Sequence, residues 1–304
     1  MACILICFLD RGSLGIIHIL SKITPTFEEV HPTGRLQRPV LCSQTHRMKI
    51  IVPVDFSDVA VNAAEFTAQM LDGYYGATLV LFHMYRSETE EKIVENRLSW
   101  LKETLQLQFK IKMETKTEMG DDFIGALARQ VRHQDADLVV MAVTDRMKII
   151  EDSYSLQMIV QSLCPVLVVP AGFAFKGIRN VALACDFKKA TTSIPLEPVK
   201  KILNLFRPQL HIVHVNRDIY ISLNEEVAAQ RAELEDMFAS YQPEFHFITT
   251  YGFHESLRQF ITDKDIDMVL TFPRKHSFFN YLLKGTNTRK LVYETEVPVL
   301  ATHE

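Results

Sequence analysis

MKIIVPVDFSD at residues 48–58 decides the fold, because a run of apolar residues leads directly into an aspartate and then into a helical pattern. An uninterrupted apolar run of this length is typical of a strand that is buried on both faces of a parallel sheet. Its carboxyl end delivers Asp55 to the rim of the sheet, where open α/β folds bind ligands. NVALACDFK at residues 180–188 repeats the design and delivers Asp186 at an offset of 131 residues (186 − 55).

Strand and helix patterns alternate on both sides of AGFAFKG, the stretch at residues 171–177 that separates the two halves. Ser57 can cap the first helix, and the apolar residues that follow it have helical spacing. A further helix is expected near residues 288–293. After the first strand, the other strands are expected at residues 77–85, 110–118, 137–143 and 165–170, and then at 181–185, 210–215, 245–249, 267–272 and 298–302.

This alternation predicts an α/β protein with two tandem doubly wound, Rossmann-like domains, each with a five-stranded parallel sheet flanked by helices. The domains are expected at residues 48–173 and 178–304. Each would end in an apolar strand with an unpaired edge, and such edges promote aggregation. We therefore expect the two last strands to pair with each other in an intramolecular pseudo-dimer, with a further homodimer left open.

Residues 1–47 do not share the pattern of the rest. Their longest apolar run, ACILICFL, is too short to cross a membrane and has no basic segment ahead of it, unlike a signal peptide. We expect this segment to be a disordered or wrongly assigned leader, with Met48 as the physiological start.

Composition narrows the classes of function. A net charge of −4 and a pI of about 6.3, without a cluster of basic residues, argue against nucleic-acid binding. The five cysteines form no CxxC pair and no His cluster accompanies them, so the spacing predicts neither disulfides nor a metal site. Cys164 and Cys185 are interpreted as small buried residues, and a cytoplasmic location without membrane attachment is expected.

Several motifs occur twice in the same order: the first strand that ends in aspartate, FHM or VHV at the end of the second strand, a glycine turn, DLVVMAV or DMVLTF, and a closing CPVLVVP or VPVLAT. Together they resemble the universal stress protein family, and residues 48–304 resemble its tandem, two-domain type. The resemblance implies a cytoplasmic stress-response protein. It also implies that some members bind ATP between the first aspartate and a glycine motif after the fourth strand, whereas others bind no nucleotide.

The glycine motif is degraded in both halves. Ala142, Asp145 and Asp152 replace its glycines in the first half, and Phe272 and Lys275 replace the first two in the second half. Glycines matter there because they let backbone amides close around phosphates. Only Gly285 and Thr286 keep the pattern, so the residues expected to retain any nucleotide contact are Asp186, Lys275, Gly285, Thr286 and Asp55.

No catalytic constellation is present, and no enzyme activity is expected. His83 and His214 repeat at strand ends, but neither has a nucleophile or a metal-ligand partner at a recognisable spacing, so satisfied structural histidines are the better interpretation. Two functions remain open. One is a stress-associated, non-enzymatic binding or scaffold protein for a protein or small-molecule ligand, without a cofactor. The other is an ATP-binding switch or weak ATPase that uses the second domain.

Overall fold

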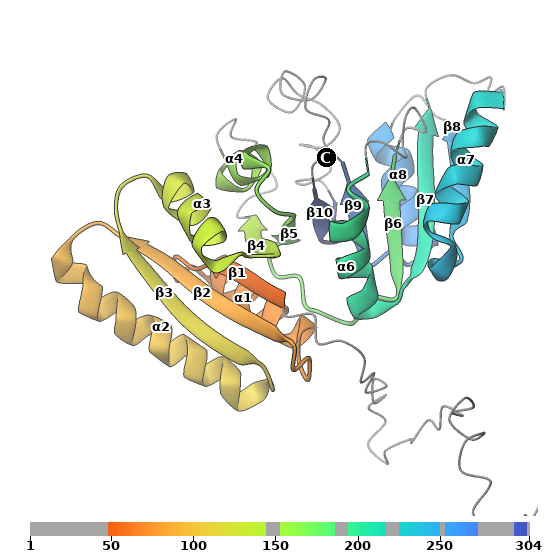
Figure 1. The fold of residues 1–304 in the computed structure, drawn as a ribbon. Coiled ribbons are helices and arrows are strands. Elements are labelled where there is room, and N and C mark those ends of the chain that lie inside the picture. The colour runs from red at the N-terminus through yellow and green to blue at the C-terminus, as the bar shows by residue number, and fades with distance from the viewer. Residues whose placement is uncertain are drawn as a thin grey trace, which may run out of the picture. The chain divides into compact units, whose positions relative to one another are not determined.

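The computed structural model describes residues 48–143, 153–185, 194–216, 225–249, 253–272 and 295–302. In the first half, strands and helices alternate as the sequence predicts (Figure 1). The strands are β1 (Met48–Pro53), β2 (Ala77–Tyr85), β3 (Lys112–Met119), β4 (Leu138–Val143) and β5 (Val166–Pro170), and the helices are α1 (Asp58–Met70), α2 (Glu88–Gln108), α3 (Phe123–Gln134) and α4 (Tyr154–Gln161).

The second half repeats this alternation. Helix α6 begins at Leu196, which places Pro198 in its first turn. Proline is tolerated there because the N–H groups of the first turn have no partner within the helix. Residues 1–47 and the helix expected near residues 288–293 lie outside the described residues. The elements are β6 (Asn180–Ala184), α6 (Leu196–Phe206), β7 (Gln209–Asn216), α7 (Glu225–Met237), the 3-10 turn η2 (Ala239–Tyr241), β8 (Glu244–Thr249), α8 (Phe253–Asp263), β9 (Met268–Thr271) and β10 (Val299–Ala301).

The described strands form one sheet in the order β3-β2-β1-β4-β5-β10-β9-β6-β7-β8. Strands β1 to β5 pair in parallel, and β6 to β10 repeat the same order and direction. Strands β5 and β10 run antiparallel, with Val168 opposite Val299 and Leu167 opposite Leu300. The expected pairing of the two last strands is therefore confirmed, and it removes both apolar edges.

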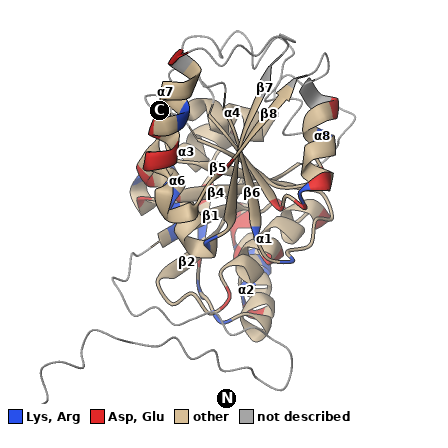
Figure 2. Ribbon diagram, turned by 90° about the vertical axis from the view of Figure 1, so that its right-hand side faces the viewer, with Lys and Arg blue, Asp and Glu red and all other residues tan. Residues whose placement is uncertain are grey.

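Helices cover both faces of the sheet. Side chains of α1, α2, α6 and α7 are buried in one core, and those of α3, α4 and α8 in the other. Successive strand residues point to opposite faces, so Ile50 and Val52 enter the first core and Ile51 enters the second. In Figure 2 the charged residues gather mainly on the helices. Burial on both faces explains why the strands are apolar throughout.

Equivalent aspartates fix the start of the central strand in each half. Asp137 Oδ2 accepts a hydrogen bond from the backbone N–H of Lys49 at 2.7 Å, and Asp267 Oδ2 accepts one from Asn180 at 2.9 Å. Asp137 also forms an ion pair with Lys201 of α6, which links the two halves. A carboxylate that accepts a backbone N–H satisfies a donor that strand pairing leaves free.

Aromatic side chains hold the connection between β5 and β6. The ring of Phe175 meets Phe66 of α1 edge to face, with centroids 5.4 Å apart, and lies 6.5 Å from Phe206 of α6. Asn62 of α1 donates a hydrogen bond to the carbonyl oxygen of Phe173 at 3.4 Å. The connection therefore packs on both halves, which belong to the single compact unit His46–Glu304. Domain boundaries at residues 47, 173 and 178 stay predictions.

Candidate functional site

The carboxyl ends of the strands form the rim at which the sequence places the candidate ligand contacts. Of these residues, only Asp55 lies in the described part of the chain. Asp186, Lys275, Gly285 and Thr286 fall in the gaps between the described ranges, so their roles stay predictions.

Asp55 occupies the turn between β1 and α1, and its side chain is exposed. Its Oδ1 accepts hydrogen bonds from the backbone N–H of Ser57 at 2.9 Å and from the Ser57 hydroxyl at 2.5 Å. Ser57 in turn caps α1 by accepting a hydrogen bond from the N–H of Ala60 at 3.4 Å. In the described geometry, Asp55 Oδ1 therefore organises the start of the helix, which is what a turn residue at this position does.

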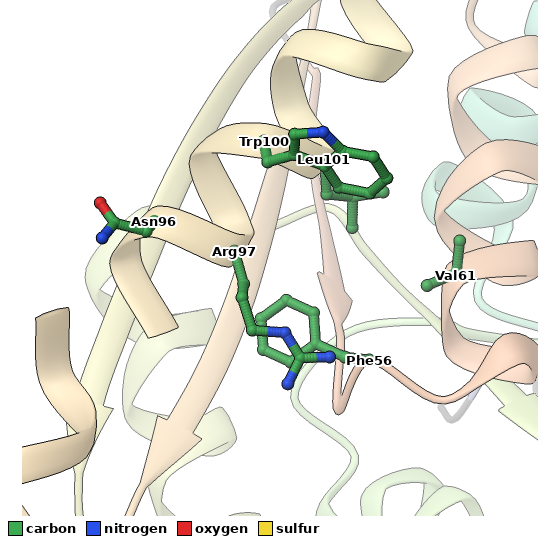
Figure 3. Close-up of a pocket in the computed structure, with 6 residues that line it drawn as sticks. All are labelled: Phe56, Val61, Asn96, Arg97, Trp100 and Leu101. Carbon is green, nitrogen blue, oxygen red and sulfur yellow. The ribbon is translucent and has the colours of Figure 1, made fainter. Parts of the chain in front are cut away.

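Phe56 follows with a φ of 63°, a left-handed conformation that bulky residues rarely adopt. Its ring lies against His83 of β2, with centroids 4.9 Å apart. On Phe56 also lies the guanidinium group of Arg97, as Figure 3 shows, with its carbon 4.0 Å from the ring centroid. An exposed cation above an aromatic ring contributes about 0.5–1 kcal/mol. His83 Nδ1 lies 2.5 Å from the carbonyl oxygen of Val54, to which it donates. Strained backbone of this kind is concentrated at binding and switch sites.

A hollow of about 290 Å³ opens beside this stack, between the β1–α1 turn, α1 and α2 (Figure 3). Its volume is just below the range of about 300–1,000 Å³ that small-molecule pockets occupy. The side chain of Trp100 contributes a wide apolar surface, and this residue is 68% exposed. The lining residues are Phe56, Val61, Asn96, Arg97, Trp100 and Leu101.

The sequence interpretation missed the α2 side of this hollow. Val94 and Leu98 belong to the buried side of α2, whereas Arg97 and Trp100 face the hollow. Arg97 and Trp100 lie more than 40 residues after Asp55, so only the fold brings them to the β1 rim. One signal was available, because Trp100 is the only tryptophan in the chain and lies outside the buried stripe of its helix.

The other side of the expected nucleotide site is described only at its ends. Ala142, in place of the first glycine, lies within β4. Ser153 caps α4 by accepting a hydrogen bond from the N–H of Leu156 at 3.4 Å. Residues 144–152, which include Asp145 and Asp152, are outside the described ranges.

The strand order and the two helical layers define a Rossmann-like α/β protein with a large, mostly parallel sheet. The fold is similar to that of a universal stress protein from Archaeoglobus fulgidus, with a TM-score of 0.62, 17% identity, and coverage of 86% of this chain and 97% of that one. A functionally unknown protein from Pseudomonas aeruginosa is similar at 0.58, with 14% identity and coverage of 85% and 93%. The cytoplasmic domain of a prokaryotic cation chloride cotransporter is similar at 0.52, with 9% identity and coverage of 85% and 96%.

Residues 46–170 match the model of the universal stress protein family. The matched segment contains β1 to β5 with their helices, so the comparison supports this family for the part of the chain that carries the β1 rim. No curated protein matches the chain. Among the helices in the described ranges, none has both the length and the apolar character required to cross a membrane.

Proposed function

We propose that the chain is a cytoplasmic, stress-associated and non-enzymatic binding protein built from two repeats of the universal stress protein type. The family match over residues 46–170 supports the first repeat. The equivalent strand order of β6 to β10 supports the second. Degraded glycine motifs in both halves argue that phosphate binding is no longer the main task.

An exposed apolar line on α2 carries this proposal. Ile93, Trp100 and Leu107 are 61%, 68% and 88% exposed and are spaced by seven residues, so they lie along one side of the helix. The line runs past the hollow, to which Trp100 also belongs. Exposed apolar residues on one side of a helix suit a binding surface, and residues seven positions apart can all face the same partner helix. The occupant that fits is an apolar helix face of a partner protein.

The polar groups of the rim support binding better than catalysis. His83 Nδ1 is engaged by a backbone carbonyl, and Asp55 Oδ1 is engaged by Ser57. A nucleophile needs a neighbouring base that is free to take its proton. Among the described rim residues, the hydroxyl of Ser57 lies beside the Asp55 carboxylate, but it is held in the cap of α1, where it accepts the N–H of Ala60.

Adenine nucleotide binding is the second candidate, and the hollow gives it one supporting observation. Trp100 and Phe56 supply aromatic surfaces beside the cation of Arg97. This combination suits a ligand that has both an aromatic ring and a negatively charged group. The second repeat would add Lys275, Gly285 and Thr286 as predicted contacts.

The single tryptophan makes the hollow directly observable by fluorescence. We expect anilinonaphthalene sulfonate, an aromatic anion, to change Trp100 emission saturably, and Arg97→Glu to weaken its affinity by about fivefold or more because the charge at the Phe56 stack is reversed. Tyr75→Ala is the matched control, since Tyr75 is 86% exposed and does not line the hollow. Equal affinity in all three proteins would overturn the assignment of the hollow.

Two further measurements distinguish the alternatives to a partner protein. A saturable change in Trp100 fluorescence on addition of ATP with Mg²⁺ would favour adenine nucleotide binding. Dimerisation in sedimentation that Trp100→Glu abolishes would assign the α2 line to a second copy of the chain.

A further inference from the structure

Three potential metal ligands meet on neighbouring strands of the second half, away from the β1 rim. His211 is on β7, and Glu244 and His246 are on β8. His211 lies opposite Glu244 in the parallel register, and His246 is two residues further along its strand, on the same face as Glu244. All three lie toward the amino ends of their strands, whereas the candidate ligand rim is at the carboxyl ends.

The donor atoms converge on one point. His211 Nδ1 lies 3.1 Å from His246 Nε2, and each of these nitrogens lies 3.5 Å from Glu244 Oε2. Zinc takes imidazole nitrogen and carboxylate oxygen at roughly 2.0–2.2 Å in a tetrahedral arrangement, which places its ligands about 3.3–3.5 Å apart. The two nitrogen–oxygen separations match the edges of a zinc tetrahedron, and the nitrogen–nitrogen separation of 3.1 Å is slightly shorter than such an edge.

We propose that His211, Glu244 and His246 form a binding site for a divalent transition metal of the Zn²⁺ type. Three protein ligands leave a fourth position for water. Strand β8 is at the end of the strand order, so the metal would clamp this outer strand to β7.

The surroundings favour neutral imidazoles, the form that binds metals. The side chain of His211 is 5% exposed and that of His246 is 19% exposed, and the Phe260 ring lies 6.1 Å and 4.9 Å from them, measured between centroids. Burial lowers the pKa of both histidines below the ordinary value.

Two neighbouring groups limit the affinity. Lys264 Nζ lies 3.8 Å from Glu244 Oε2 and competes with a bound cation for that carboxylate. His211 Nε2 is buried and has no hydrogen-bond partner among the described residues, so its N–H would lack an acceptor when Nδ1 binds a metal. Removing the lysine charge should strengthen binding.

The sequence predicted no metal site because it contains no recognisable ligand spacing. His211 and His246 are 35 residues apart, and only the parallel pairing of β7 and β8 brings them together. A signal was present in the two predicted neighbouring strands, because each has a histidine near its start, His211 in one and His246 in the other.

Zinc uptake by the full chain without a histidine tag tests the proposal. After equilibrium dialysis, Glu244→Gln and His246→Gln should each bind one Zn²⁺ fewer than the wild type, and Lys264→Gln should bind about threefold more tightly. His133→Gln, which changes an exposed histidine on α3, is the control and should keep the wild-type stoichiometry. Circular dichroism identifies variants that fail to fold.

Cobalt provides a second readout, because it gives intense visible absorption when its site is tetrahedral. We expect such a spectrum for the wild type, without a thiolate band, and its loss in His246→Gln. Equal zinc stoichiometry and equal cobalt spectra in the wild type and both ligand variants would overturn the proposal and leave a hydrogen-bonded histidine pair.

Discussion

His83 Nδ1 lies 2.5 Å from the carbonyl oxygen of Val54, just beyond the end of β1. His214 makes the same contact in the second half, with its Nδ1 3.2 Å from the carbonyl oxygen of Cys185. Both residues of the pair are displaced by 131 positions (214 − 83 and 185 − 54). The repeated histidines therefore satisfy backbone acceptors, as the sequence interpretation expected.

Replacement of His83 by leucine should lower the free energy of unfolding by about 1–3 kcal/mol, because the Val54 carbonyl loses its partner in a partly buried site. Urea denaturation measures the change. His133→Leu, on the exposed side of α3, should change stability by less than about 0.5 kcal/mol. Equal stability of the two variants would show that the His83 contact contributes nothing.

Asp137→Ala and Asp267→Ala should both destabilise the chain, by about 1–3 kcal/mol each, because each leaves a strand-start N–H without its acceptor. Asp121→Ala, at an exposed turn position, is the control. A large loss from only one of the two aspartates would contradict their equivalence in the two halves.

Stability should fall in mildly acidic solution because of His211 and His246. Burial lowers the pKa of both in the folded chain, whereas the unfolded chain titrates near about 6.5. The unfolded state therefore binds more protons below that pH, so the stabilisation is complete above about 6.5 and is lost as pH falls through the lowered values. Urea unfolding at about pH 7.5 and about pH 5.5, with a chelator, should show this loss. His246→Gln should have a shallower dependence, and an unchanged one would refute the assignment.

Nucleotide affinity that relies on the glycine motif should depend on the second half, where Gly285 and Thr286 keep the phosphate-binding pattern. Thr286→Asp should abolish it, because a carboxylate repels phosphate. ATP binding that survives Thr286→Asp but is lost in Asp55→Ala would place the site in the first half.

The sequence predicts the fold far better than the site. Buried strands such as β1 and β4 have apolar runs that permit few other structures, and the repeat fixes their order. The position of Asp55 at the rim could be predicted because it follows β1 directly. The positions of Arg97 and Trp100 beside the hollow could not be predicted, because they depend on how α2 packs beside the β1–α1 turn. Side chains that meet only through tertiary packing leave no local spacing signal.

Calorimetric titration of the full chain with ATP and Mg²⁺, combined with a phosphate-release assay, tests the central claim that this is a non-enzymatic binding protein with degraded nucleotide loops. We expect no phosphate release, and either no saturable heat or a dissociation constant weaker than about 1 mM, a binding free energy of about −4 kcal/mol. A micromolar dissociation constant together with steady ATP turnover would contradict the account.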